Sequence, residues 1–363
     1  MPIKGLILCA GLGSRLRPLT YSSAKHLIPV ANKPIVFYII EWLKAAGITE
    51  IGIVVGVNRH EISQAVGNGD RWGVSISYID QINPLGTAHA VQVAQDFVEQ
   101  DPFVMILGDN MFQGGLERFV EQYRRTTPDG MVMLHQTDRP HDFGIAEVKD
   151  GLVVGLEEKP EEPRSNLAVA GVYVFNPSIF EAITRIEPSP RGELELPDAV
   201  RLLMDQGMRF ESHQLEGWWR DTGRPEDVIE LNRLLLEELP HAQIEGQVDG
   251  ESAVIGKVSL SQGARIERSR IVGPVVIGPD TVISDSYIGP YTSIGAGCAI
   301  KGSEVEYGVV MDETEIEGIS ERIGCSLIGK QVRITRTSQR PLQNVFVVGD
   351  RSEVRILVAS NGT

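Results

Sequence analysis

Cysteine is scarce in this chain, and its three residues form no pair that could bind zinc or found a disulfide framework. Cys9, Cys298 and Cys325 are odd in number and widely separated. Structural zinc sites use closely spaced Cys or His pairs, and small disulfide scaffolds use an even set of cysteines. The scarcity therefore favours a reducing compartment, and we expect a cytoplasmic protein.

Long apolar runs are also missing. No stretch reaches the ~18 apolar residues that a membrane helix needs. The apolar start, Gly5 to Ala10, is too short for a secretory signal, and Arg15 and Arg17 follow it at once. We therefore expect no membrane partner.

Positive charge is in deficit. Lys and Arg number 34 against 49 Asp and Glu, which gives a formal charge of −15. Nucleic acids and anionic membranes bind surfaces of broad positive potential. The deficit argues against a nucleic-acid partner, and an anionic ligand must instead be held by a local basic pocket.

The length and apolar content suffice for two domains with hydrophobic cores, since 42% of the 363 residues are hydrophobic and 23% are charged. In residues 1–240 short β-branched runs alternate with amphipathic stretches, which predicts an α/β domain with a mostly parallel sheet. After Met131 the predicted strands follow one another closely, which indicates antiparallel additions on one side of the sheet. The expected strands cover residues 3–9, 50–55, 74–79, 103–107, 131–136, 145–148, 152–156 and 168–175, and the expected helices cover residues 34–47, 86–98 and 223–238.

The sequence pattern changes at Gln243, and the new pattern predicts a second domain over residues 243–363. Apolar residues recur at steps of six, six and five, so that the pattern repeats every 17 residues, as at Ile266, Ile283 and Ile300. Ser252, Ser269, Ser286 and Ser303 keep the same spacing, and glycines often follow the apolar positions. A coil of three short sides stacked on its neighbours, a parallel β-helix, fits this pattern. A β-sandwich with regular turns is the alternative.

A glycine-rich loop follows the first predicted strand, in the sequence Ala-Gly-Leu-Gly-Ser-Arg-Leu at residues 10–16. Glycine lets the backbone approach a phosphate closely, and ligands of open α/β sheets bind at the carboxyl ends of the strands. The loop lacks the third glycine of a dinucleotide fingerprint and the Gly-Lys-Ser/Thr of a P-loop. By itself it is equally consistent with a tight structural turn.

The loop together with Lys25-His-Leu-Ile-Pro29 and Lys33-Pro34 resembles the signature of the nucleotide-sugar pyrophosphorylases. Over essentially the whole chain, the resemblance is to the long-form glucose-1-phosphate thymidylyltransferases, which carry a C-terminal left-handed β-helix. It implies a Rossmann-like nucleotidyltransferase domain that joins a nucleoside triphosphate to a sugar 1-phosphate and releases pyrophosphate. The implied substrates are dTTP, or alternatively UTP, and glucose 1-phosphate. The resemblance also implies a homo-oligomer.

Two carboxylates match the family's ligands for Mg²⁺, Asp109 in Gly-Asp-Asn and Asp221 in Trp-Arg-Asp-Thr-Gly. Oxygen ligands and substrate phosphates suit this hard cation. A turn at Asp109 and a helix cap at Asp221 are the structural alternatives. Arg15 and Lys25 match the cations that flank the α-phosphate. Because a sugar phosphate is already ionised at pH 7, we expect charge neutralisation and positioning to dominate catalysis.

The resemblance assigns the remaining binding residues. Gln81 and Gly86 match the pair that recognises a pyrimidine, and a glutamine amide can both donate and accept. The nucleotide-binding set comprises Leu8, Ala10, Gly11, Gly13, Ser14, Arg15, Lys25, Gln81, Gly86 and Asp109. The sugar-phosphate-binding set comprises Gly144, Glu158, Lys159, Val169 and Arg191.

Four positions depart from the family pattern, and three of them, Phe143, Pro197 and His26, leave the identity of the sugar open. Ala10 stands where many relatives have Gly, Phe143 where short forms have Tyr, Pro197 where Thr is usual, and His26 where Gln is common. Two further hypotheses are a bifunctional acyltransferase and a non-catalytic homologue. All seven histidines lie at or before residue 241, so the β-helix lacks the base that acyl transfer generally uses. The joint presence of Arg15, Lys25, Asp109, Lys159 and Asp221 argues against a non-catalytic protein.

Overall fold

The computed structural model describes residues 2–336, 348 and 350–355. Contacts divide these residues into two compact units, which are described separately. The first, here called the sheet unit, comprises residues 2–12, 23–27 and 35–221. The second, here called the β-helix unit, comprises residues 13–22, 28–34 and the described residues from 222 onward. The domain boundary near residue 240 stays a prediction.

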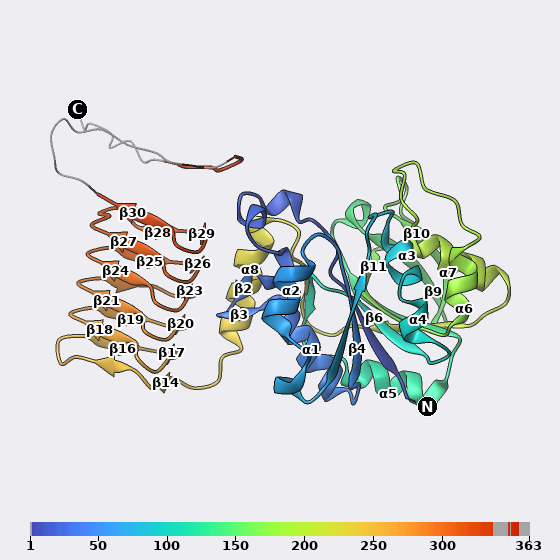
Figure 1. Cartoon of the computed structure of the whole chain (residues 1–363), viewed down its shortest axis with the longest axis horizontal. Helices are drawn as coiled ribbons and strands as arrows, with labels where there is room; N and C mark the ends of the chain where they lie inside the picture. The colour runs from blue at the N-terminus through green and yellow to red at the C-terminus, as the bar shows by residue number, and fades with distance from the viewer. Residues whose placement is uncertain (1, 337–347, 349, 356–363) are drawn as a thin grey trace. The chain divides into compact units, whose positions relative to one another are not determined.

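The sheet unit is built on a nine-stranded mixed sheet (Figure 1). The predicted first strand lies between its two parallel neighbours, with Ile7 opposite Ile53 on one side and Ile106 on the other. The order along the sheet is β5 (Ser75–Asp80), β4 (Glu50–Val55), β1 (Lys4–Leu8), β6 (Phe103–Leu107), β11 (Leu167–Phe175), β8 (Gly130–Gln136), β12 (Phe210–Gln214), β10 (Leu152–Glu158) and β9 (Gly144–Lys149).

The predicted antiparallel additions are confirmed, and so is the α/β class. β11 runs antiparallel to β6, β8 and β9, and β10 runs antiparallel to β9 and β12. The sequence analysis missed β12, which is parallel to β8, and a two-stranded sheet of β7 (Asn110–Phe112) and β13 (Trp219–Asp221). This small sheet places Asp221 opposite Asn110.

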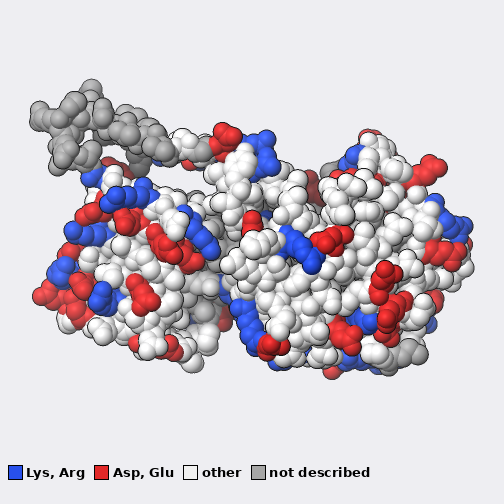
Figure 2. Space-filling model, viewed as in Figure 1, with Lys and Arg blue, Asp and Glu red and all other residues white. Residues whose placement is uncertain are grey.

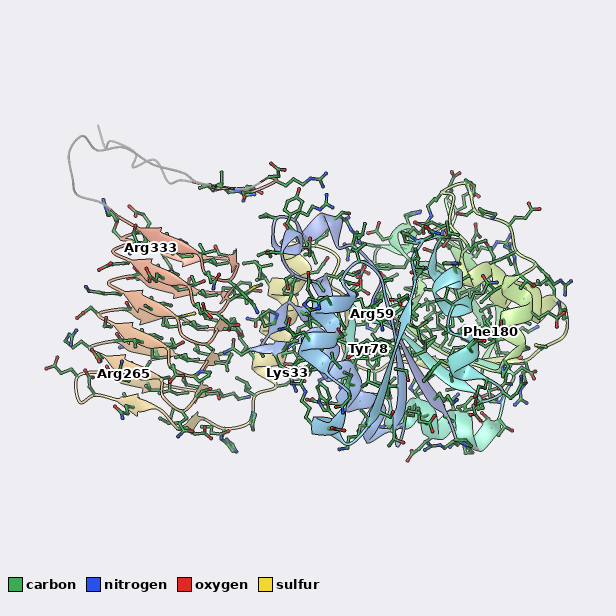
Figure 3. All side chains as sticks on the ribbon, in the orientation of Figure 1. Lys33, Arg59, Tyr78, Phe180, Arg265 and Arg333 are labelled. Atoms are coloured by element: carbon green, nitrogen blue, oxygen red, sulfur yellow. The ribbon has the colours of Figure 1, made fainter. Side chains whose placement is uncertain are left out.

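Helices pack on both faces of the large sheet. Leu6 and Leu8 of β1 share one core cluster with residues of α3, α4, α6 and α7. On the other face, a Cβ added to Gly5 would lie 3.1 Å from Leu43 of α1. Figure 3 labels Phe180 of α6, whose ring stacks on that of Phe103 at 5.7 Å. The helices of this unit are α1 (Ile35–Ala45), α2 (Arg59–Val66), α3 (Thr87–Gln92), α4 (Gln95–Val98), α5 (Glu117–Thr126), α6 (Ser178–Ile183) and α7 (Leu196–Asp205).

One predicted helix is wrong in its extent. The sequence predicts a single helix over residues 86–98, but the structure has α3 and α4 separated by a turn at Val93 and Ala94. The buried residues Val91, Ala94 and Val98 keep helical spacing across that turn. Because the apolar periodicity continues through the break, it gives no sign of it.

The β-helix unit contains the predicted coils, and its strands stack in three parallel sheets (Figure 1). Val258 pairs with Val275 and Val275 with Thr292, which is the expected 17-residue step. All these pairings are parallel, so the β-sandwich alternative is wrong. The sheets are β14 (Gln243–Ile244), β17 (Val258–Leu260), β20 (Val275–Ile277), β23 (Thr292–Ile294), β26 (Gly308–Val310) and β29 (Leu327–Ile328); β15 (Gln247–Val248), β18 (Arg265–Glu267), β21 (Val282–Ser284), β24 (Ala299–Lys301), β27 (Glu315–Glu317) and β30 (Arg333–Thr335); and β16 (Ala253–Ile255), β19 (Arg270–Val272), β22 (Tyr287–Ile288), β25 (Glu304–Glu306) and β28 (Ile323–Gly324).

The regularly spaced serines form a hydrogen-bonded ladder inside the β-helix. The Ser252 hydroxyl accepts from the Ser269 N–H at 3.0 Å, the Ser269 hydroxyl from the Ser286 N–H at 3.0 Å, and the Ser286 hydroxyl from the Ser303 N–H at 3.2 Å. Each coil thus satisfies a buried backbone donor of the next coil. The isoleucine row of the repeat, which includes Ile266, Ile283 and Ile300, fills the interior.

Helix α8 (Pro225–Glu237) packs on the β-helix within the same unit, through a buried asparagine. Asn232 accepts hydrogen bonds from the Ala31 N–H at 2.8 Å and the Ser293 hydroxyl at 2.6 Å, and donates to the Tyr291 carbonyl. Ala31 lies in the turn of a short hairpin, β2 (Pro29–Val30) and β3 (Lys33–Pro34). Asn32 of the same turn donates to the Ile294 carbonyl at 2.6 Å.

The surface carries both signs of charge. On the face that Figure 2 shows, Lys and Arg side chains are interspersed with Asp and Glu. Arg265 and Arg333, labelled in Figure 3, lie on strands β18 and β30 of one β-helix sheet, and Arg333 pairs with Glu315 at 2.9 Å. Among the described helices, none combines the length and the apolar character that crossing a bilayer requires.

Candidate active site

The carboxyl ends of β1 and β6 bring two predicted site segments together in the sheet unit. The Gly108 N–H donates to the Leu8 carbonyl at 2.9 Å, and the Cys9 N–H donates to the Val54 carbonyl at 2.7 Å. The buried Asn58 side chain donates to the Cys9 carbonyl at 2.8 Å. Leu8, Ala10 and Gly11 therefore lie at the same edge as the Gly-Asp-Asn turn, where open α/β sheets bind ligands.

Lys25 and Asp109 form an ion pair at this edge, 84 positions apart in the sequence. Their side chains are 16% and 14% exposed, so water screens the pair little. A Cβ added to Gly11 would lie 3.2 Å from both Cε and Nζ of Lys25. Glycine at position 11 thus leaves the space that the lysine side chain crosses.

Asp221 reaches the same place through the small sheet. β13 runs antiparallel to β7 with Asp221 opposite Asn110, the residue next to Asp109. The Asn110 amide donates to Oδ1 of Asp109 at 3.1 Å and accepts from the Trp219 indole N–H at 2.8 Å. A strand pairing and two hydrogen bonds therefore bring the two predicted carboxylates together.

Mutual attraction governs the titration of these groups. Burial alone would raise the pKa of Asp109, but the nearby Lys25 and His26 and the hydrogen bonds from Lys25 and Asn110 together hold this pKa below its usual range. Burial alone would lower the pKa of Lys25, but Asp109 and then Asp221 raise it above its usual value. Lys25 is therefore a cation and Asp109 an anion at neutral pH.

His26 and Cys9 lie beside this pair but serve packing. Burial, with the Lys25 charge, lowers the pKa of His26 to about 3, so its ring is neutral at pH 7. Burial raises the pKa of the Cys9 thiol above its ordinary value, which leaves it protonated. A Cβ added to Gly108 would lie 2.5 Å from Sγ of Cys9 and 2.9 Å from the His26 ring. The departure at His26 therefore lies beneath the turn, inside the protein.

Gln81 and Gly86 also come together, at the carboxyl end of β5. Nε2 of Gln81 donates to the Gly86 carbonyl at 3.2 Å and lies 3.0 Å from Nδ1 of His89. Gln81 is 5% exposed. The sequence analysis treats its amide as both donor and acceptor, but both of its N–H groups have partners within the protein.

The Gly86 loop is joined to the segment that carries Arg191. Leu194 donates its N–H to the Leu85 carbonyl at 2.8 Å and accepts from the Ala88 N–H at 3.0 Å. Gly86 has φ +115°, and a Cβ there would lie 2.5 Å from the Leu194 carbonyl oxygen. Only glycine fits this approach, which links the predicted base-binding and sugar-phosphate-binding loops.

The predicted sugar-binding residues Gly144, Glu158 and Val169 form one group in the sheet unit. Gly144 pairs with Glu158 across β9 and β10. A Cβ at Gly144 would lie 3.1 Å from Oε2 of Glu158 and 3.8 Å from Val169. Burial raises the pKa of Glu158, with Lys159 and Arg191 opposing that shift and Glu195 adding to it. A half-buried carboxylate beside a glycine suits hydroxyl groups as donors.

Two cations border this group. Nζ of Lys159 lies 3.9 Å from Oε1 of Glu158, and the Lys159 backbone has a φ of +46°. Arg191 contacts Glu158 at 3.3 Å and the buried Glu195 at 2.7 Å. In this structure the Arg191 charge is therefore already paired with carboxylates, while its side chain remains 41% exposed.

The remaining predicted residues, Gly13, Ser14 and Arg15, belong to the β-helix unit and are described within it. Gly13 has a left-handed backbone and precedes a 3₁₀ turn, Ser14–Leu16. The Thr20 hydroxyl donates to the Gly13 carbonyl at 2.7 Å, and a Cβ at Gly329 would lie 3.1 Å from Leu19. The loop that carries Arg15 thus packs on a β-helix coil.

Sequence reasoning missed Asn110 and Trp219 as residues that position the carboxylates. Gly171 was also missed. It leaves space for the Asn110 side chain, because a Cβ at Gly171 would lie 2.9 Å from Cγ of Asn110. Trp219 also packs edge-on against Phe143, with ring centroids 4.8 Å apart. Both lie next to predicted residues, Asn110 after Asp109 and Trp219 two before Asp221, but nothing in the sequence indicated that they contact each other.

The donor set suits a hard divalent cation that is also bound by substrate. Asp109 and Asp221 offer carboxylate oxygens, and no described trio of His, Cys, Asp or Glu side chains is placed to hold a metal by itself. A cation at the two carboxylates would therefore take its other ligands from phosphate and water, as Mg²⁺ commonly does.

Comparison with known proteins places these features in context. The sequence model of the family described as nucleotidyl transferase matches residues 4–238. A glucose-1-phosphate thymidylyltransferase of Streptomyces antibioticus is 48% identical over 356 residues, 98% of this chain and 99% of that protein. The enzyme of the same name from Streptomyces griseus is 47% identical over 98% of this chain and 99% of its own length.

A solved structure agrees with these relatives. It comes from Bacillus anthracis, is provisionally described as a glucose-1-phosphate thymidylyltransferase, and was determined in complex with a sucrose. Its TM-score is 0.61 at 34% identity, and the match covers 66% of this chain and 98% of that one. Since the family match spans more than half of the residues, the chain belongs to the nucleotidyl transferase family.

Proposed function

We propose that this protein transfers a thymidylyl group from dTTP to α-D-glucose 1-phosphate, which yields dTDP-glucose and pyrophosphate. An oxygen of the sugar phosphate attacks the α-phosphorus, a new P–O bond forms, and the bond to pyrophosphate breaks. The cluster of Lys25, Asp109 and Asp221 at the carboxyl edge of the sheet carries the proposal. The two Streptomyces relatives, alike over nearly their full length, support the choice of substrates.

Lys25 and Arg15 are the proposed cations at the α-phosphate. Lys25 is held by Asp109 and is fully charged at neutral pH, since its pKa is raised. Charge that develops on the transferring phosphoryl group is stabilised by such preorganised cations. Leu8, Ala10, Gly11, Gly13 and Ser14 are the proposed lining of the nucleotide, since glycine lets the backbone approach a phosphate closely.

The sugar phosphate is proposed to lie between the group of Gly144, Glu158 and Val169 and the cations Lys159 and Arg191. Glu158 would accept hydrogen bonds from sugar hydroxyls through its half-buried carboxylate. Arg191 shares its charge with Glu158 and Glu195 before substrate arrives. We propose that a phosphate competes for this guanidinium, whose exposed fraction of 41% leaves it accessible.

Mg²⁺ is the proposed cofactor, with Asp109 and Asp221 as its protein ligands. When bound, it supplies positive charge that neutralises the triphosphate oxygens. Asn110 orients Asp109 by hydrogen bonding, and Trp219 orients Asn110. These residues hold the carboxylate oxygens in place for a divalent cation.

UTP is the main alternative to dTTP, since thymine and uracil share the same imide edge. Acyl transfer by the β-helix remains disfavoured by its lack of histidine. We propose a cytoplasmic location, consistent with three free thiols, Cys9, Cys298 and Cys325. We also propose a homo-oligomer, as the family resemblance implies.

The test is release of pyrophosphate by the purified full chain. The assay combines Mg²⁺ with dTTP, UTP, dCTP, ATP or GTP and a panel of hexose 1-phosphates. We expect the highest kcat/KM for dTTP with glucose 1-phosphate and measurable turnover of UTP. Absence of pyrophosphate release from both dTTP and UTP with every sugar phosphate would overturn the proposal, and a preference for a purine would exclude the assigned base site.

A further inference from the structure

A histidine outside the predicted site contacts the residue assigned to the base. His89 lies in α3, and its Nδ1 is 3.0 Å from Nε2 of Gln81. The other partner of Nε2 is the Gly86 carbonyl, at 3.2 Å. A carbonyl oxygen can only accept a hydrogen bond, so the nitrogen of the Gln81 amide must face it. This contact fixes which end of the amide is the nitrogen.

The same argument fixes the tautomer of His89. The Gln81 amide nitrogen carries two hydrogens and is a donor only. Facing it, Nδ1 of His89 must accept, so the neutral ring carries its proton on Nε2. With both N–H groups of Gln81 engaged, Oε1 is the polar atom left for a ligand, and no described residue donates to it.

We infer that His89 is a positioning residue that locks the Gln81 amide with its oxygen toward the base and so selects an imide over cytosine. The inference rests on the proposed function and on the assignment of Gln81 to the base that the family resemblance implies. Thymine and uracil carry an N–H at the ring nitrogen N3, which donates to a carbonyl oxygen. Cytosine has an unprotonated N3, which would face that oxygen acceptor to acceptor, leaving both unpaired at a cost.

Gln81 by itself would discriminate poorly between an imide base and cytosine. A free glutamine amide can rotate by a half turn and present either its oxygen or its NH₂ group. The Gly86 carbonyl restrains the amide, but at 3.2 Å it accepts only one of the two amide hydrogens. His89 binds the second, and the half-buried helix α3 holds its ring in place. Selectivity then comes from orientation, since a site built for one hydrogen-bond pattern rejects its inverse.

The experiment measures kcat/KM for dTTP and dCTP with glucose 1-phosphate in four full-length proteins. His89→Leu removes the acceptor, His89→Gln supplies a new acceptor oxygen, and His60→Leu changes an exposed histidine of α2. We expect His89→Leu to lower the dTTP-to-dCTP ratio roughly 5- to 10-fold, mainly through KM for dTTP. His89→Gln should recover at least half of the loss in the logarithm of this ratio. His60→Leu should leave the ratio at the parent value.

Each outcome separates this inference from the proposed function. If the parent turns over dTTP and folded His89→Leu keeps the parent ratio, the positioning role is wrong while the proposed function stands. If His89→Leu lowers kcat for both nucleotides equally, or raises KM for glucose 1-phosphate as much as for dTTP, His89 is merely structural. If the parent does not use dTTP or UTP, the proposed function itself fails. Melting temperatures confirm that each variant is folded.

Discussion

Both units contain a buried polar network, but the two networks are organised differently. In the β-helix, each serine of the ladder accepts from the backbone of the next coil, 17 residues on. In the sheet unit, Lys25 and Asp109 pair across 84 positions, and Asn110 and Trp219 bond across 109. The first network repeats one local interaction, whereas the second brings together unlike groups from distant segments.

The difference separates stability from chemistry. The ladder satisfies backbone donors that a β-helix would otherwise bury unpaired, and it leaves no charge uncompensated. The lysine–carboxylate cluster concentrates one cation and two anions at a strand end, where their charges can act on phosphate. Breaking the ladder should therefore affect unfolding, and breaking the cluster should affect turnover.

The largest expected effect comes from Asp109→Asn. Loss of the carboxylate charge removes a proposed metal ligand and the partner of Lys25, and we expect kcat to fall by about 10³-fold or more. Asp221→Asn should behave similarly. Pyrophosphate release across a range of Mg²⁺ concentrations measures both, with Asp96→Asn on the exposed side of α4 as the control. Near-parent turnover at saturating Mg²⁺ would remove either residue from the metal site.

A smaller loss is expected for Gly86→Ala. The new Cβ would lie 2.5 Å from the Leu194 carbonyl oxygen, so the base-binding loop must move away from the Arg191 segment. We expect kcat/KM for dTTP to fall roughly 10- to 100-fold. Gly207→Ala is the control, because Gly207 also has a left-handed backbone, with φ +88°, but a Cβ there has nothing within 4 Å. If both variants lose activity equally, backbone strain rather than the contact with Leu194 is responsible.

Ser286→Ala tests the other network. Ser286 is buried, and its replacement leaves the Ser303 N–H without its acceptor. We expect the free energy of unfolding to fall by ~1–3 kcal/mol, with kcat unchanged at temperatures where the variant is folded. Urea unfolding and the pyrophosphate assay measure the two quantities. Ser284→Ala, at the end of the preceding strand β21, should change stability by no more than ~0.5 kcal/mol. A loss of activity in folded Ser286→Ala would contradict the separation.

The smallest effect is a difference in pH dependence. Since the folded-state pKa of Asp109 is below its unfolded value, the pair stabilises the fold above pH ~4 and loses this contribution as the pH falls further. The free energy of unfolding of the ligand-free parent should therefore decline more steeply below pH ~4 than that of Asp109→Asn. Urea titrations between pH 2 and 7 compare the slopes. Parallel curves would mean that Asp109 titrates normally in the folded protein.

Much of the fold could be predicted because it follows from local patterns. The 17-residue period predicted the β-helix, since every coil buries the same side of the chain. The alternation of strands and helices predicted the α/β unit. The break between α3 and α4 could not be predicted, because Val91, Ala94 and Val98 are apolar on both sides of it. The strand β12 was missed because Phe210 is the one fully buried residue in its otherwise polar sequence.

The site was predicted less completely. Family motifs predicted Lys25, Asp109 and Asp221 as site residues by resemblance, but spacing alone did not relate residues 84 and more positions apart. The orientation of Gln81 was open in the sequence, because a glutamine amide is symmetric in shape and its direction depends on His89 and the Gly86 carbonyl. Asn110, Trp219 and Gly171 received no role until their contact was visible.

The sequence by itself determined the repeat, the strand–helix alternation and the residue types that can bind phosphate, because periodicity and composition are properties of neighbours along the chain. Only the tertiary structure decided that Asp221 lies opposite Asn110, that His26 is buried and neutral, and that Leu194 closes over Gly86. These depend on strand register and close packing between distant segments. The free energy that fixes them is shared among many contacts, and no single stretch of sequence contains it.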